Sequence, residues 1–162
     1  MTPSDTPDHP SIDIAPLGED DAGEVLTIQR AAFVSEAQIY GSADMPPLTQ
    51  TLDEMRAELR MGAGLGARID GRLVGAIRYR EDGDLLLIGR IAIAPDMQGE
   101  GIGRALLDAA EQRSSATTAE LFTGSLSEAN IRLYTSCGYE ERERVPDGDG
   151  TAQVFLRKLL AR

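Results

Sequence analysis

The sequence contains very few of the residues that carry metal and triad chemistry. Its 162 residues include one cysteine, one histidine and no tryptophan. The single cysteine, Cys137, excludes an intramolecular disulfide and a zinc cluster built from cysteines. The single histidine, His9, lies in a polar, proline-containing N-terminal stretch that is unsuited to a buried catalytic triad. We therefore expect no metal site, and neither a serine nor a cysteine hydrolase.

The sequence also lacks a long hydrophobic run. No stretch reaches the roughly 18 apolar residues of a membrane span, and the N-terminus carries acids where a signal peptide carries bases. We expect a cytoplasmic protein. The length fits one domain. Residues 1–10 are too polar and proline-rich to pack, so a disordered tail is expected there and the folded domain over 11–162.

Positive charge is scarce, and its distribution is uneven. The formal net charge is −11, which argues against nucleic acid as a partner. Residues 1–60 hold 12 acids and 3 bases, whereas residues 61–162 hold 15 acids and 13 bases. A solvated tail and exposed helix faces would explain this excess. The alternative is an acidic rim that attracts a cationic amine.

The apolar pattern of the first half predicts a strand, two helices and an antiparallel meander. The strand lies around Ile12 and Ile14, a helix extends to about residue 35, and a shorter helix starts near Leu52 and ends before residue 62. Three antiparallel strands follow, near residues 64–69, 72–81 and 84–94, with a tight turn at Asp70-Gly71. The third is almost continuously apolar, which predicts burial on both faces, and it stops at Pro95.

The second half predicts a β-α-β crossover and a final hairpin. An amphipathic helix from Ile102 leads to a strand at 119–123, which must lie parallel to the previous strand through a right-handed crossover. A helix at 127–136 and strands at 139–145 and 152–160 complete the chain. The fold class is therefore α+β, a single domain with a mixed, mostly antiparallel central sheet and flanking helices.

The turn before the crossover helix is rich in glycine. It runs Gln98-Gly99-Glu100-Gly101-Ile102-Gly103-Arg104, so main-chain N–H groups could approach an anion at the positive end of the helix. It lacks the Gly-Lys-Ser/Thr of a Walker loop, and Arg104 stands where a dinucleotide fingerprint needs its third glycine. A phosphate-binding turn and tight packing between strand and helix both remain open.

Two motifs resemble those of a known family. The segment Ile91-Ala92-Ile93-Ala94-Pro95, followed by Gln98-x-x-Gly101-x-Gly103 and Ala105-Leu106-Leu107, resembles the acetyl-CoA-binding motif of GNAT acyltransferases. Asn130-Ile131-Arg132-Leu133-Tyr134, followed by Gly138-Tyr139, is similar to the second signature of that family. With the order of elements, the resemblance covers residues 11–160.

The resemblance implies acetyl-CoA as co-substrate and a splayed sheet that binds it. The main chain of Ile91, Ala92 and Ile93 would hold the pantetheine arm and the thioester, and Asn130 would bond the pantetheine region. The pyrophosphate would be held by the amides of Gln98, Gly99, Glu100, Gly101, Ile102, Gly103 and Arg104. Ser127 stands at the spacing that other members use for the asparagine, and is otherwise an ordinary helix N-cap.

The resemblance also implies the reaction: transfer of an acetyl group to a primary amine of a small molecule or peptide, by direct attack in a ternary complex. Tyr134 matches the general acid of the family by position. Its alternative role is that of a core aromatic whose hydroxyl bonds to the backbone. Where members carry a glutamate base, this chain has Phe122 and, nearby, Arg90. A water, Glu36 or Asp84 must then be considered as the base.

Several other residues have two interpretations. Cys137 is a buried filler rather than a nucleophile, because no histidine can activate it. Four residues between the first two helices contact substrate or shape a loop: Tyr40, Met45, Pro46 and Pro47. Four strand arginines bind an acidic acceptor or the phosphates of the coenzyme, or else face solvent: Arg68, Arg78, Arg80 and Arg90.

The alternative to an enzyme is a non-catalytic acyl-CoA sensor or interaction module. A dinucleotide-binding reductase is disfavoured by Arg104. A homodimer is common in the resembled family. The acidic first third of the chain leads us to expect a cationic amine as the acceptor.

Overall fold

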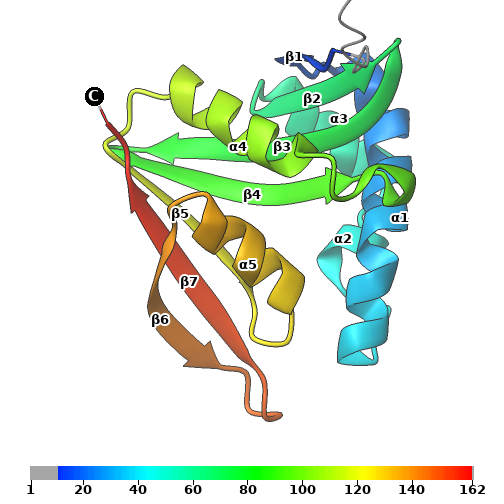
Figure 1. The fold of residues 1–162 in the computed structure, drawn as a ribbon. Helices are drawn as coiled ribbons and strands as arrows, with labels where there is room; N and C mark the ends of the chain where they lie inside the picture. The colour runs from blue at the N-terminus through cyan, green and yellow to red at the C-terminus, as the bar shows by residue number, and fades with distance from the viewer. Residues whose placement is uncertain (1–10, 162) are drawn as a thin grey trace, which may run out of the picture.

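The protein is a seven-stranded mixed sheet with helices on both faces, as a computed structural model that describes residues 11–161 shows (Figure 1). The tail expected over residues 1–10, with His9, lies outside the described residues. The strand order is β1-β2-β3-β4-β5-β7-β6. The strands are β1 (Asp13–Pro16), β2 (Gly64–Ile69), β3 (Arg72–Asp82), β4 (Leu85–Ile93), β5 (Thr118–Gly124), β6 (Glu140–Pro146) and β7 (Ala152–Leu159). The α-helices are α1 (Ala22–Tyr40), α2 (Pro46–Thr49), α3 (Leu52–Arg60), α4 (Ile102–Arg113) and α5 (Glu128–Ser136).

The predicted α+β class, the antiparallel meander, the parallel crossover and the final hairpin are confirmed. Strands β1 to β4 form an antiparallel meander, and the turn between β2 and β3 places Asp70 at φ 49° and Gly71 at φ 81°. Both angles lie in the left-handed region that a tight Asp-Gly hairpin needs. Helix α4 is the crossover that brings β5 parallel to β4.

The helices of the first half differ from the prediction in length and number. Helix α1 continues to Tyr40 and ends at Gly41, whose φ of 69° suits the left-handed end of a helix. The short helix α2 was not predicted. Helix α3 starts as predicted, behind a capping box in which Thr51 and Glu54 each accept the other's main-chain N–H at 3.2 and 3.0 Å.

Two hydrophobic cores cover the two faces of the sheet. The larger core packs α4 and α5 on one face, around Ile102, Leu106, Leu107 and Tyr134. The smaller core packs α1 and α3 on the other face, around Val25, Met55 and Leu59. Within residues 11–161 no helix is both long enough and apolar enough to cross a bilayer.

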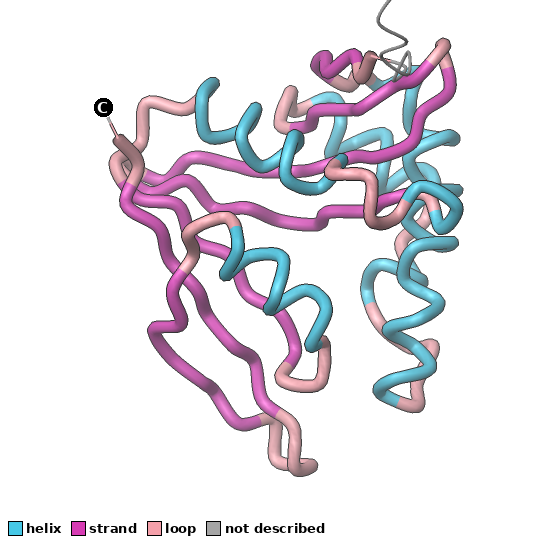
Figure 2. The backbone as a smooth tube through the Cα atoms, viewed as in Figure 1, coloured by secondary structure: helices cyan, strands magenta, loops and turns pink. Residues whose placement is uncertain are grey.

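The predicted burial of β4 on both faces is wrong. Only its alternate residues Leu86, Ile88 and Ala92 are fully buried, whereas Leu85, Leu87 and Ile91 are partly exposed. The second face of the strand is incompletely covered because the sheet opens beside it. Strands β4 and β5 start close together near the C-terminus of the chain and then diverge (Figure 2).

Candidate functional site

The sheet opens between β4 and β5. These strands pair only at Leu85–Leu87 and Thr118–Glu120, while β5 stays paired with β7 along its whole length. Beyond Leu87, this edge of β4 pairs with no strand in residues 11–161. Main-chain polar groups on such an edge need other partners. The predicted positions Ile91, Ala92 and Ile93 lie on it.

A β-bulge lies where the strands diverge. Ile77 pairs with Ile91 and Tyr79 with Ile88, so Gly89 and Arg90 together face the single residue Arg78. A Cβ at position 89 would lie 3.0 Å from the Arg78 carbonyl oxygen, which favours glycine there. Bulges redirect side chains and the edge of a strand. Here the bulge turns Arg90 towards α1–α3.

The glycine turn between β4 and α4 presents free amides. Gly99 and Gly101 have φ of 80° and 81°, and Gly101 is the N-cap of α4. None of the N–H groups from Gln98 to Arg104 donates to an acceptor in the described part of the chain. Consecutive free amides at the positive end of a 12-residue helix are an anion-binding arrangement.

The side chains of this turn do not cover the amides. A Cβ at Gly99 or Gly101 would meet open space, so these two glycines are required for their backbone conformation. Gly103 is different, because its Cβ would lie 3.1 Å from Leu133 Cδ2. Glu100 is exposed, and the Arg104 guanidinium donates to the Ser136 hydroxyl at 2.9 Å. Gly99 and Gly101 thus serve the backbone conformation of the turn, and Gly103 serves close packing against α5.

Tyr134 on α5 is buried, at 8% exposure. Its ring meets that of Tyr139 edge to face, with centroids 6.4 Å apart. The hydroxyl makes no hydrogen bond within residues 11–161, although every fully buried side-chain polar atom there has a partner. The hydroxyl of this core residue is therefore not fully buried, and it is left without a protein partner in that part of the chain. Burial, with Glu36 nearby, raises the pKa of Tyr134 well above 10.0.

A hydrogen-bond network joins the end of α1 to the start of α5. Ser127 donates to Glu36 Oε2 at 2.6 Å and shares a 2.8 Å hydrogen bond with the Tyr40 hydroxyl. Asn130 Nδ2 donates to Glu36 Oε1 at 3.3 Å and to Thr123 Oγ1 at 3.4 Å. Ser127 is the N-cap residue of α5 by position, but its hydroxyl caps no N–H there. It bonds across the gap instead.

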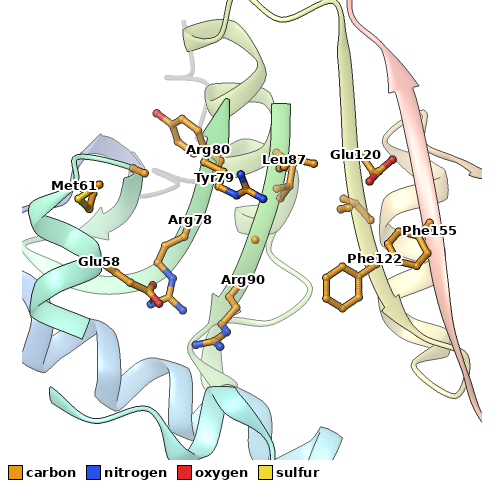
Figure 3. Close-up of a pocket in the computed structure, with 14 residues that line it drawn as sticks. Glu58, Met61, Arg78, Tyr79, Arg80, Leu87, Arg90, Glu120, Phe122 and Phe155 are labelled. Carbon is orange, nitrogen blue, oxygen red and sulfur yellow. Dashed lines mark ion pairs between the residues drawn. The ribbon is translucent and has the colours of Figure 1, made fainter. Parts of the chain in front are cut away.

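A cavity of about 640 Å³ opens on the α1–α3 side of the gap (Figure 3). Side chains from β3, β4, β5, β7 and α3 line it. In Figure 3, Arg78, Arg80 and Arg90 lie on the β3–β4 side, and Phe122 and Phe155 lie across the gap. On β4 the cavity is lined by residues 87–90, which include the bulge and stop before Ile91, so it adjoins the free β4 edge without containing the glycine turn.

Arg78 is the most buried charged group of this cavity. Its Nη2 donates to Gln29 Oε1 at 2.6 Å, and its Nη1 lies 3.0 Å from Glu58 Oε2. Burial lowers the pKa of Arg78 to about 10, against the opposing effect of Glu58. Gln50 Oε1 accepts from Arg90 Nη1 at 2.7 Å and thereby joins the two arginines.

The comparisons with known proteins agree with this geometry. A sequence model described as "Acetyltransferase (GNAT) domain" matches residues 62–141, which include the β4 edge, the glycine turn and Tyr134. The chain belongs to the GNAT family. Its fold matches that of the PaiA N-acetyltransferase of Thermoplasma acidophilum in complex with coenzyme A, with a TM-score of 0.74 at 19% identity, over 92% of this chain and 99% of that one.

The chain is also similar to one further solved structure and to one curated protein. YncA of Salmonella typhimurium, solved with acetyl-CoA, matches with a TM-score of 0.73 at 18% identity, over 94% of this chain and 95% of that one. The UPF0157 protein YqkA of Bacillus subtilis (strain 168) is 32% identical over 130 residues, 80% of this chain. The chain spans 37% of the length of that protein.

The GNAT fold places the remaining predicted residues at different distances from the cavity. Asp84 lies exposed in the turn between β3 and β4 and does not line the cavity. Arg68 forms ion pairs with Asp21 and Glu24 on the surface. Cys137 is buried at the end of α5. Glu36 does not line the cavity either, so neither of the two acids predicted as a possible base, Glu36 and Asp84, faces it.

Sequence reasoning missed Glu58, Glu120 and Phe155 among the residues that line this cavity. It also missed Gln50, which accepts a hydrogen bond from Arg90. Glu120 lies two residues before Phe122 on the same face of β5, so strand alternation could have found it. Glu58 follows the buried Met55 at a spacing of three on α3, which places it beside the buried face. Gln50 and Phe155 carry no comparable signal.

Proposed function

We propose that this protein transfers the acetyl group of acetyl-CoA to a primary amine. The observation that carries the proposal is the Tyr134 hydroxyl, which is free of protein partners in residues 11–161 and lies on the helix that flanks the open gap. The free amides from Gln98 to Arg104 suit a pyrophosphate. The unpaired main chain of Ile91 and Ile93 suits the amide-bearing pantetheine arm.

The coenzyme supplies an activated thioester, and the residues of this chain supply binding and proton transfer. The amides of the glycine turn bind the anionic end, and Asn130 can turn its amide from Glu36 to the pantetheine region. Tyr134 holds a proton at Oη for the sulfur that leaves. Because its pKa is raised, the proton stays on the phenol throughout the neutral range, and the leaving thiol has a usual pKa near 8.5.

The attacking amine must lose a proton. An aliphatic ammonium with a pKa near 10.4 is neutral in about one molecule in a few thousand at pH 7, which costs roughly 4–5 kcal/mol. Two carboxylates line the cavity, Glu120 and Glu58. Glu120 is 18% exposed and pairs with Arg157 at 2.6 Å, while Glu58 pairs with Arg78. We assign the proton acceptor to these carboxylates, with Glu120 nearer to the position of Phe122.

The Tyr134→Phe variant tests the proposal. We expect kcat to fall by about 100-fold or more, because general acid catalysis typically contributes that much. Coenzyme A affinity in calorimetry should stay within threefold, since the free amides are untouched. Tyr139→Phe is the matched control. It removes a buried hydroxyl that already has a protein partner, Glu111, at 3.4 Å, and turnover should persist.

Two outcomes would contradict this assignment. Turnover that is unchanged in Tyr134→Phe would exclude the phenol as the acid. Coenzyme binding without release of free thiol, on any amine of a broad panel, would instead favour the non-catalytic sensor.

A further inference from the structure

The cavity beside the bulge is cationic, although the chain as a whole carries a charge of −11. Three arginines and two glutamates line it. Both glutamates form ion pairs with arginines: Glu58 pairs with Arg78, and Glu120 pairs with Arg157. Arg80 and Arg90 form no ion pair with residues 11–161. The acids of the first third do not reverse this balance, because Glu19, Asp21 and Glu24 pair with arginines outside the cavity.

Arg90 is the arginine placed to bind a ligand. It is partly buried, and its one hydrogen bond within the described chain goes to the neutral Gln50 through Nη1. Gln50 Oε1 also accepts from Gln29 at 3.0 Å and from Arg78 at 3.4 Å, so it cannot satisfy the rest of the guanidinium. Glu58 and Glu54 oppose the lowering of the Arg90 pKa by burial but form no ion pair with Arg90, so part of its charge is left for an anionic ligand. Its planar fork matches the two oxygens of a carboxylate.

The opposite wall of the cavity is aromatic. Phe122 is 57% exposed, although it is a large apolar side chain on a central strand. It stacks at a tilt on Phe155 of β7, with ring centroids 5.5 Å apart. An exposed ring backed by a half-buried one at a cavity wall is a surface for the apolar part of a ligand.

We propose that the acceptor is an amino acid with an apolar side chain, whose carboxylate binds Arg90 and whose apolar body packs on Phe122 and Phe155. This inference rests on the proposed acyl transfer and names its substrate class. The cavity volume of about 640 Å³ suits a small molecule of this kind. The amine would then lie by the bulge, next to the free β4 edge. This assignment competes with the expectation of a purely cationic amine.

Three matched acceptors separate the two possibilities: L-phenylalanine, L-phenylalaninamide and phenethylamine. They share the apolar body and the amine, but only the first has a carboxylate. We expect kcat/KM to be at least about 10-fold higher for L-phenylalanine than for either analogue, as for a charge-assisted hydrogen bond.

Arg90→Gln should lower kcat/KM for L-phenylalanine by roughly 10- to 100-fold and leave that for phenethylamine within about threefold. Arg90→Lys keeps the charge without the fork and should recover only part of the loss. Arg113→Gln is the charge-matched control, because Arg113 is exposed at the end of α4 and does not line the cavity. Arg113→Gln should leave kcat/KM unchanged for both L-phenylalanine and phenethylamine.

Calorimetry with coenzyme A present separates the failure of this inference from the failure of the proposed function. Binding of L-phenylalanine that Arg90→Gln weakens by the same factor supports the site, even if no acetylated product forms. The inference is overturned if phenethylamine is the best acceptor and is insensitive to Arg90. It is also overturned if L-phenylalanine neither binds nor reacts while another amine is acetylated.

Discussion

The two sides of the gap are built from different parts of the chain. On the α4 side, the glycine turn and the β4 edge offer main-chain groups, and the side chains of Gln98 and Glu100 are exposed. On the α1–α3 side, the cavity is built from side chains of five elements. If the proposed function holds, the contrast explains how one fold can keep a coenzyme site while its acceptor site varies, since a main-chain site depends on a few glycines alone.

Substitution in the glycine turn should give the largest effect. Gly101→Val places a β-branched residue at φ 81°, which costs about 1–3 kcal/mol and moves the free amides if the backbone relaxes. We expect coenzyme A affinity in calorimetry to fall by about 100-fold. Glu100→Gln is the control on the same turn, and its effect should stay within threefold. A larger loss of coenzyme A affinity in Glu100→Gln would show that a side chain of the turn contributes to binding, and would contradict a site made of main-chain groups alone.

Arg78 should matter for stability as well as for the cavity. Arg78→Leu leaves the buried Gln29 without its 2.6 Å partner, and we expect the free energy of unfolding in urea to fall by about 2 kcal/mol. Arg56→Leu breaks only the exposed pair with Asp53 and should stay within about 0.5 kcal/mol. If the free energy of unfolding fell as little in Arg78→Leu as in Arg56→Leu, the hydrogen bonds of the buried arginine would add nothing to stability.

Phe122 tests the aromatic wall alone. Phe122→Ala should raise KM for an aromatic acceptor by about 10-fold, as expected for the loss of one aromatic contact. Coenzyme A affinity should not change, because the ring lies outside the glycine turn. Leu126→Ala is a comparison at another exposed apolar residue, 46% exposed, and should have no such effect. A loss of coenzyme A affinity in Phe122→Ala would show that the aromatic wall also supports coenzyme binding, and would contradict the separation of the cavity from the glycine turn.

The pH profile should show the smallest change. The raised pKa of Tyr134 favours its protonated form, so kcat should not fall between pH 7 and 10 through loss of that proton. The same shift implies that its contribution to folding stability persists below pH 10 and is lost only as the pH rises through the higher folded value. A fall in kcat centred near pH 8.5 would contradict this account of the acid.

The sequence was most informative where a residue type is required by the backbone. The Asp70-Gly71 hairpin and the glycine turn were predictable because positive φ angles restrict the residue that can stand there. The extent of α1 was not. Its last turn is held by Tyr40, whose hydroxyl accepts the Leu126 N–H at 3.1 Å and bonds to Ser127, contacts that span more than 80 residues.

The cavity was the least predictable part. A continuous apolar run in β4 is compatible with a closed core, yet Leu87 and Ile88 line the open cavity. Arg78 and Arg90 were ambiguous as strand residues, since their partners Gln29 and Gln50 come from segments 40 or more residues away. Local periodicity cannot specify a tertiary polar network of this kind.

The network of Glu36, Tyr40 and Ser127 has a mechanical consequence. The two halves of the sheet are joined by three residue pairs at one end of the gap, and this network joins α1 to α5 at the other. The contact between Tyr40 and the start of α5 requires glycine at position 124, because any Cβ there would collide with the Tyr40 hydroxyl. A gap fixed at both ends has its width set before a ligand arrives, so little binding free energy is spent on reshaping the protein.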